Sequence, residues 1–279
     1  MVIYNPKDWF SLIFKFHKSD TFRKLFWVIV AISIYSLIVA YLEIEIWKLE
    51  HTNTSVMHSL LGFVLSLLLV FRTNTAYDRW WEGRKQWGAL VNSSRNLAIK
   101  LSSILINEPQ ACLKLERLIA IYPAVLKEHL RGKKVNEFPT EFHQPNFIML
   151  KINEEIFDLQ RKGKMSSSDV WLIKDELASL ADVCGACERI KKTPIPYSYS
   201  LFIKKFIFIY VMSLPFGFVG DFGYRVPLLV AFVMYVLASL ELLAEEIEDP
   251  FGIDTNDLPT DEITETIQAN VKEIFQSKI

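Results

Sequence analysis

The 279-residue sequence lacks the marks of several common protein classes. Its three cysteines do not form the pattern of a disulfide framework. Its formal net charge of -1 gives no electrostatic argument for binding nucleic acid. It has no phosphate loop of the Gly-x-x-x-x-Gly-Lys type and no serine elbow, and its five histidines show no ligand spacing. The sequence therefore gives little support for an enzyme, and it predicts no metal centre and no nucleic-acid partner.

The N-terminus lacks the pattern of a cleaved secretory signal. Asp8, Lys15 and Lys18 are spread through the first 22 residues, which hold no continuous apolar core. Aromatic residues alternate with these charges. We therefore expect an amphipathic segment at the cytoplasmic face of a membrane instead of a leader peptide.

Apolar residues are what the sequence has in quantity. Hydrophobic residues make up 51% of the chain and the mean hydropathy is +0.21, whereas charged residues still make up 23%. This combination favours a membrane protein with a sizeable water-facing part, and the helical spacing of the apolar residues in that part makes the predicted fold all-α. Four apolar stretches predict membrane-spanning helices: residues 25–44, 56–71, 201–219 and 226–243.

These spans divide the chain into four predicted parts. Residues 1–71 hold the N-terminal segment and two spans, residues 72–192 a cytoplasmic helical domain, residues 193–245 two further spans, and residues 246–279 a cytoplasmic tail. Lys and Arg are dense before the first span, after the second and before the third. The positive-inside rule then places both termini in the cytoplasm of a multi-pass protein of the inner (plasma) membrane.

The stretch from residue 56 to residue 96 organises the rest. It is apolar up to Phe71 and polar from Arg72, with no proline and no helix-ending glycine at the join. We predict one long helix that leaves the membrane and continues into water. Its apolar part is about 24 Å long, which is short for a lipid-facing span but sufficient for a helix inside a bundle.

Two faces of this helix differ. Phe63, Leu67 and Phe71 recur at every fourth residue and share one stripe, called here the neck stripe. Gly62 and Ser66 form a small pair that lets another helix approach closely. The pattern fits a pore helix with apolar rings at the lumen. It fits an ordinary buried membrane helix more often, because apolar stripes at helical spacing usually lie in a core.

The polar continuation resembles a known family. Residues 71–85, FRTNTAYDRWWEGRK, are similar to the signature of bacterial bestrophin homologues, and the Arg-Trp-Trp at residues 79–81 also resembles the eukaryotic bestrophin channels. The Pro-Ile-Pro-Tyr at residues 194–197 and the Asp-Pro-Phe-Gly at residues 249–252 support this, so the resemblance covers nearly the whole chain. It implies a homopentameric ion channel in a lipid bilayer, with a central pore.

The resemblance also implies the location of the pore neck. In bestrophins the second membrane helix lines a narrow apolar neck with three residues spaced by four, and these positions match Phe63, Leu67 and Phe71. The prokaryotic neck usually begins with an aliphatic residue, so Phe63 departs from the pattern. Such a neck would act as a hydrophobic gate.

A second constriction is implied at the cytoplasmic exit, on a helix predicted between residues 170 and 190. Leu177 or Leu180 would form this aperture. Glu176 and Asp182 would favour cations if they face the lumen. Bacterial members of the family look like monovalent-cation channels, whereas animal members conduct chloride.

Arg79, Trp80, Trp81 and Trp87 would lie where the long helix leaves the bilayer. One interpretation is an interfacial aromatic belt. The resemblance implies a structural anchor that sets the pore helix, and the two are compatible.

Two further motifs have modest interpretations. Cys184 and Cys187 form a Cys-x-x-Cys in the middle of a predicted helix, with no second pair for zinc, so we expect small buried residues at a helix contact. In animal bestrophins the acidic run after Pro-Phe-Gly builds a calcium clasp. Asp254 and Asp257 match two of its positions, but the dense charge is absent, and a solvated turn is the alternative. We expect no cofactor, with calcium as the alternative.

Taken together, the sequence predicts a bestrophin-like channel that conducts monovalent ions passively, with sodium or potassium preferred. The alternatives are a chloride channel of the same family and a non-conducting membrane scaffold. A transporter is disfavoured because we see no internal repeat and no broken span.

Overall fold

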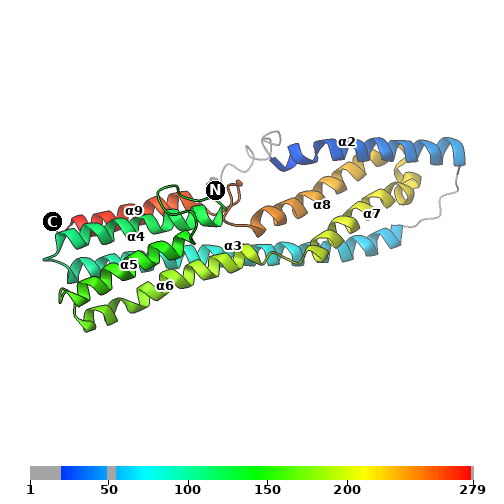
Figure 1. The fold of residues 1–279 in the computed structure, drawn as a ribbon. Helices are drawn as coiled ribbons and strands as arrows, with labels where there is room; N and C mark the ends of the chain where they lie inside the picture. The colour runs from blue at the N-terminus through cyan, green and yellow to red at the C-terminus, as the bar shows by residue number, and fades with distance from the viewer. Residues whose placement is uncertain (1–19, 49–54, 278–279) are drawn as a thin grey trace. The chain divides into compact units, whose positions relative to one another are not determined.

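A computed structural model describes residues 20–48 and 55–277, and these residues form helices without any strand. The all-α prediction is therefore confirmed for this part of the chain (Figure 1). The helical elements in chain order are α2 (Asp20–Tyr41), the π-helical η3 (Leu42–Trp47), α3 (Ser55–Ile104), α4 (Pro109–Leu130), α5 (Gln144–Arg161), α6 (Ser167–Lys192), α7 (Tyr197–Phe222), the 3-10 turn η4 (Gly223–Arg225), α8 (Val226–Glu248) and α9 (Thr260–Gln276).

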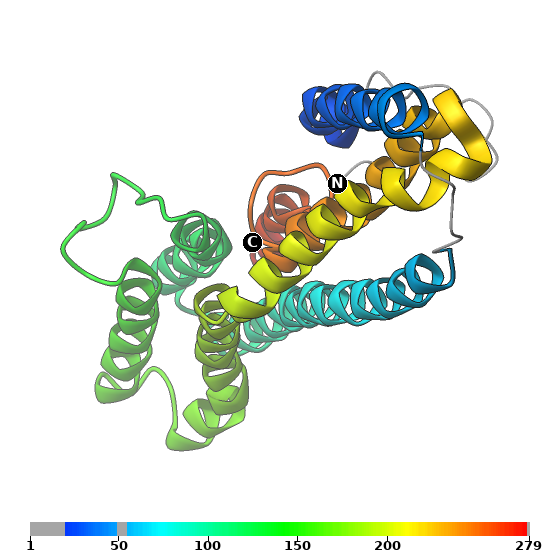
Figure 2. The ribbon, with the colours of Figure 1, turned by 90° about the vertical axis from the view of Figure 1, so that its right-hand side faces the viewer.

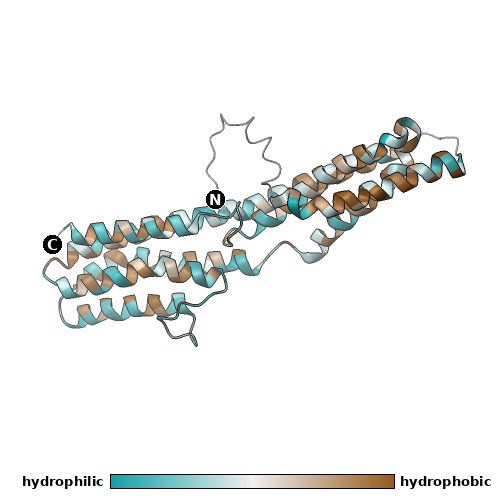
Figure 3. Ribbon diagram, turned by 90° about the horizontal axis from the view of Figure 1, so that it is seen from above, coloured by the Kyte–Doolittle hydropathy of each residue, from teal (hydrophilic) through white to brown (hydrophobic). Residues whose placement is uncertain are grey.

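The fold consists of two compact units, and α3 contributes to both. The apolar unit contains the described residues up to Asp78 together with Pro194–Glu248. The amphipathic unit contains Arg79–Thr193 and the described residues from Asp249 onwards. The colouring by hydropathy separates them: apolar residues dominate the helices of the first unit, whereas polar and apolar stripes alternate along those of the second (Figure 3).

In the apolar unit α2 lies alongside α8, and α7 packs against both (Figures 1 and 2). Three stretches are long and apolar enough to cross a membrane: Thr21–Trp47, Val56–Ile104 and Tyr197–Glu248. The last of these holds two of the predicted spans, and η4 breaks it into α7 and α8 at Gly223, whose φ is +53°. Many large apolar side chains point outwards, such as Trp27 and Leu228 at 75% and 76% exposed, which is the surface that a bilayer requires.

The prediction of one long helix is confirmed by α3, which runs through 50 residues without a break. The absence of proline and of a helix-ending glycine at the apolar-to-polar join explains this continuity. At about 1.5 Å per residue it is roughly 75 Å long.

In the amphipathic unit α4 packs against α5, α6 and α9, and α5 packs against α6. The core contains the second half of α3, including Trp87 and Leu97, both fully buried. The helix boundaries follow local signals in the sequence. Ser166 and Asp169 form a capping box at the start of α6, and Gly163, with φ of +74°, follows the end of α5.

Candidate functional site: the exposed stripe of α3 and its anchors

The first half of α3 has one buried face and one open face. Leu65 and Leu69 are 0% and 2% exposed in the core of the apolar unit. The neck stripe is open: Phe63, Leu67 and Phe71 are 68%, 46% and 55% exposed. Steps of four turn a helix by about 400°, so the three side chains stay within roughly 80° of one another. The chain therefore packs one side of α3 and leaves a continuous apolar stripe on the other.

Polar side chains follow on the same stripe. Asn74 and Asp78 are exposed, and helical geometry places both within the sector spanned by Phe63 and Phe71. The stripe thus passes from three large apolar side chains to an amide and a carboxylate on one face. The sequence analysis did not single out Asn74 and Asp78, although continuing the stripe by a step of three and then a step of four would have found them.

Gly62 allows a close contact between α3 and α7. A Cβ at Gly62 would lie 2.6 Å from the Tyr210 hydroxyl, so a larger residue there would have to displace the Tyr210 side chain. Ser66, its predicted partner in the small pair, is exposed and donates its hydroxyl back to the Gly62 carbonyl at 2.7 Å. Of the predicted small pair, Gly62 is therefore the residue at which another helix, α7 of the same chain, comes close to α3.

Arg72 forms a buried ionic network where α3 turns polar. Its side chain is 1% exposed, with Nη2 2.7 Å from Glu248 Oε2 and Nε 3.5 Å from Glu241 Oε2. The other oxygen of Glu248, Oε1, accepts the backbone N–H of Ile195 at 2.6 Å. A buried cation is tolerated only when such partners compensate its lost hydration. The network ties α3 to α8 and to the Pro-Ile-Pro-Tyr motif.

Arg79 anchors α3 to the end of α6. Its Nη2 donates to the Ile190 carbonyl at 2.5 Å, and its Nη1 donates to the Thr193 carbonyl. The last carbonyls of a helix lack intrahelical partners and carry partial negative charge, so an arginine there is favourable. Trp80 donates its indole N–H to the Asn256 carbonyl at 3.0 Å.

Two of the motifs that resemble the bestrophin family, residues 71–85 and residues 249–252, pack against each other. A Cβ at Gly83 would lie 3.2 Å from the Phe251 ring and 3.2 Å from Pro250, and Phe251 is 1% exposed. Gly83 thus permits the Asp-Pro-Phe-Gly turn to approach α3. The interfacial interpretation is wrong for Trp87, because its side chain is fully buried in the core; Trp81, at 48% exposed, remains a candidate.

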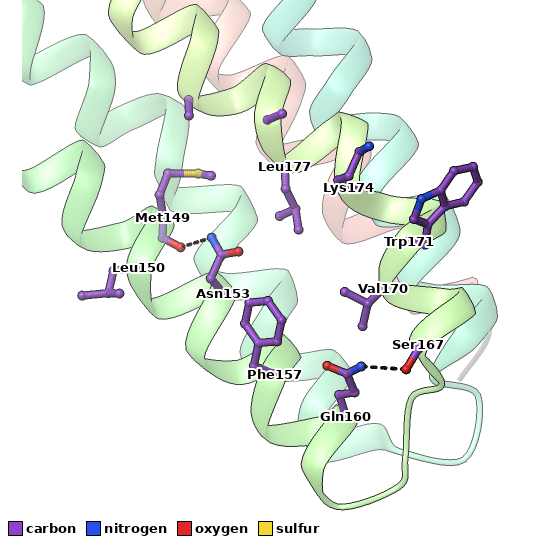
Figure 4. A pocket seen from close by; sticks show the side chains of 12 residues that line it. Met149, Leu150, Asn153, Phe157, Gln160, Ser167, Val170, Trp171, Lys174 and Leu177 are labelled. Atoms are coloured by element: carbon purple, nitrogen blue, oxygen red, sulfur yellow. Dashed lines mark hydrogen bonds between the residues drawn. The ribbon is translucent and has the colours of Figure 1, made fainter.

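The two aperture candidates differ in burial. Leu180 is 0% exposed and belongs to the core, and its carbonyl accepts the Tyr122 hydroxyl at 2.8 Å. A side chain enclosed by its own chain cannot line a pore, so the prediction is wrong for Leu180. Leu177 projects from α6 towards α5, into a pocket of about 670 Å³ that it shares with Asn153 and Phe157 (Figure 4). Its role as an aperture residue stays a prediction.

The two acidic residues predicted to line the ion pathway, Glu176 and Asp182, differ in their surroundings. Glu176 is paired with Lys100, whose Nζ lies 2.6 Å from Oε1, so its charge is largely neutralised. Asp182 is exposed. Glu176 therefore supports a cation preference less than the sequence suggested.

Asp257 stabilises the loop between α8 and α9 in which it lies. It is 2% exposed, and its Oδ2 accepts the backbone N–H of Asp254 at 2.6 Å. This contact fits the turn-forming alternative, while Asp254 is exposed. Calcium binding here stays the alternative to the predicted absence of a cofactor.

Cys184 and Cys187 are free and buried in α6, as expected for small residues at a helix contact. Burial, together with the nearby negative charge of Glu188, raises the pKa of each thiol to about 12. Both thiols are therefore protonated at neutral pH and are poor nucleophiles and poor metal ligands.

Comparison with known proteins decides the family. The family model described as Bacterial/Fungal Bestrophin protein matches residues 1–273. The chain belongs to the bestrophin family. A bacterial bestrophin homologue from Klebsiella pneumoniae, known from a crystal structure, superposes with a TM-score of 0.83 at 30% identity, covering 90% of this chain and 98% of that one.

Curated relatives of this bestrophin extend over nearly its full length. A voltage-dependent anion channel-forming protein from Nostoc sp. is 32% identical over 286 residues, which cover 96% of this chain and 92% of that protein. YneE of Escherichia coli, named in the same way, is 29% identical over 283 residues, with 97% and 93% covered. Membership of this family agrees with the lack of support for an enzyme in the sequence.

Proposed function

We propose that this bestrophin is a passive ion channel whose pore neck is lined by Phe63, Leu67 and Phe71. The observation that carries the proposal is that three large apolar side chains, at the positions that match the family's neck, lie on the face of α3 that the chain leaves unpacked. The opposite face is buried in the apolar unit, so the open stripe can face an axis shared by copies of the chain. Asn74 and Asp78 follow on the same face, beyond the apolar segment, and would line the aqueous continuation of that passage.

We propose a homopentamer in the plasma membrane, with four spans per subunit and both termini in the cytoplasm. One subunit cannot enclose a pore with a stripe that faces away from its own core, so copies must surround an axis. The number five comes from the family resemblance. Support for four spans comes from η4, which separates α7 from α8, and the orientation rests on the distribution of Lys and Arg.

In this arrangement the neck controls conduction through hydration. A ring of apolar side chains offers an ion no replacement for its water shell, so a narrow neck forms a barrier when it is dry. Wetting of the neck would open the channel. Because the neck carries no charge, it does not discriminate between cations and anions. Rings of charged side chains elsewhere along the pore would do so.

For ion sign we propose anions as the permeant class. The names of the curated relatives favour anions over the sodium or potassium expected from the sequence, and the pairing of Glu176 with Lys100 weakens the argument for cations. Cation conduction is the second candidate, and the exposed carboxylate of Asp78 is the observation that favours it.

Reconstitution tests these proposals in one experiment. The purified protein is placed in planar bilayers under a potassium chloride gradient, and the reversal potential is read. A value near the chloride equilibrium potential supports an anion channel, and a value near that of potassium supports the second candidate. Absence of current from a protein that is pentameric by mass measurement in detergent would instead support the non-conducting scaffold.

A further inference from the structure

Two histidines and a glutamate meet in the amphipathic unit although they are far apart in sequence. His129 lies in the last turn of α4, His143 is the N-cap of α5, and Glu188 lies on α6. Their ligand atoms lie within 4.8 Å of one another, and within the described residues this is the one group of three or more potential metal ligands that does so. All three side chains are partly buried, at 28%, 32% and 20% exposed, and thus remain open to solvent.

The geometry converges on a single oxygen. Nε2 of His129 is 2.6 Å from Glu188 Oε1, and Nε2 of His143 is 2.5 Å from the same atom. The imidazole rings are 4.3 Å apart between centroids. Two nitrogen atoms and one oxygen atom, from the end of α4, the residue that caps α5 and one face of α6, therefore lie close together.

We propose that His129, His143 and Glu188 form a binding site for a divalent transition-metal ion of the zinc class. Two imidazole nitrogens and one carboxylate oxygen are a donor set that suits Zn²⁺, whereas Ca²⁺ and Mg²⁺ prefer oxygen ligands. Metal–ligand bonds of about 2.0–2.2 Å in a tetrahedral site separate the ligand atoms by roughly 3.3 Å. Opening the two nitrogen–oxygen contacts by less than about 1 Å through rotation of Glu188 achieves this, and solvent supplies the fourth ligand.

The charges around the site are compatible with a cation. Glu188 brings a carboxylate to the site, and both of its oxygens lie near nitrogen atoms: Oε1 faces the two imidazoles and Oε2 faces Lys192. Lys192 Nζ lies 3.6 Å from Glu188 Oε2, and its side chain is 70% exposed, so it can withdraw into water. Cys184, one turn earlier on α6, is buried and stays a neutral thiol, so it does not compete for the ion.

Metal binding competes with the cap of α5. Nδ1 of His143 accepts the backbone N–H of Asn146 at 3.2 Å, so in the metal-free protein the proton of this ring is on Nε2. Coordination through Nε2 moves that proton to Nδ1, which then no longer accepts from Asn146. His143→Asn separates the two roles, since asparagine is a good N-cap but brings no imidazole to the metal.

The test uses the full-length protein in detergent, stripped with a chelator, desalted and titrated with Zn²⁺ by calorimetry. We expect one ion per chain and a loss of affinity of at least about tenfold in His129→Ala, His143→Asn and Glu188→Gln. Asp175→Asn, at an exposed acid on the same helix, is the matched control and keeps wild-type affinity. Absence of saturable Zn²⁺ binding to the wild-type protein, or wild-type affinity in all three site variants, would overturn the proposal.

A second readout needs no variant and covers the case in which the variants misfold. Co²⁺ bound to the wild-type protein should show the visible absorption of a four-coordinate site with nitrogen and oxygen ligands. A strong near-ultraviolet band from cysteine thiolate coordination would place the ion at Cys184 and Cys187 and overturn the assignment. These readouts do not depend on conduction, so the site and the channel proposal fail or succeed separately.

Discussion

Arg72 of α3 and Glu248 of α8 form a buried ion pair, with 2.7 Å between Nη2 and Oε2 and only 1% of the arginine side chain exposed. The pair lies at the position where α3 changes from apolar to polar. Glu248 also receives the backbone N–H of Ile195, so a single carboxylate joins three segments of the apolar unit. Arg72 therefore has a structural role: it helps to hold these three segments together.

Arg72→Met should destabilise the protein strongly. It leaves Glu241 and Glu248 buried without their cation, and breaking a buried pair in this way costs about 3–5 kcal/mol. Thermal unfolding followed by tryptophan fluorescence in detergent measures the effect. Lys204→Met, which breaks the exposed pair with Glu245, is the control and should cost about 1 kcal/mol or less. Equal shifts in both variants would show that the Arg72 network contributes no more than a surface pair.

Combined replacement of Phe63, Leu67 and Phe71 by Ala should raise single-channel conductance or abolish gating. The smaller side chains widen and wet the neck, so the dehydration barrier falls. Ion sign should stay unchanged because no charge is altered. The control is Leu228→Ala on α8, a side chain 76% exposed on another helix. If the triple variant assembles as the wild type does and its conductance and gating are unchanged, the neck lies elsewhere.

Asp78→Asn should move the reversal potential towards the chloride equilibrium potential. A ring of carboxylates attracts cations and repels anions, so removing it favours anions whichever ion dominates in the wild type. The shift should shrink in concentrated salt, which screens the charges. Asp175→Asn removes an exposed acid from α6 and should leave the potential unchanged. A shift towards the cation potential in Asp78→Asn would contradict the placement of Asp78 beside the pathway.

Gly83→Ala should lower stability by about 1–3 kcal/mol, because the added methyl group must displace Phe251 and Pro250, which lie 3.2 Å from its position. Gly88→Ala is a matched control on the same helix. The nearest atom to its new methyl is the flexible tip of Arg84 at 3.5 Å, and alanine favours helix by up to about 1 kcal/mol. The two melting temperatures should therefore move in opposite directions, and a gain in both would show that the turn adapts without cost.

The sequence by itself determined the features that depend on local energies. The continuity of α3 followed from the absence of breaking residues at the join, and the start of α6 followed from the hydrogen bonds that Ser166 and Asp169 make with the first turn. The neck stripe followed from helical period. In each case the signal is the free energy of a short segment, which neighbouring residues along the chain set.

Only the tertiary structure decided which of several equivalent side chains are enclosed. Leu177 and Leu180 are both apolar residues of α6, as Trp81 and Trp87 are both tryptophans of α3, yet one of each pair is fully buried and the other is not. Burial depends on how each helix is rotated against its neighbours, and that rotation minimises the free energy of packing over the whole unit.

The histidines illustrate the same limit. His129 and His143 have no ligand spacing in the sequence, and Glu188 is 45 residues beyond the second of them. They converge because the end of α4, the start of α5 and one face of α6 are brought together by the core that these helices bury. No local energy encodes such a meeting, since the contacts that create it join residues far apart along the chain.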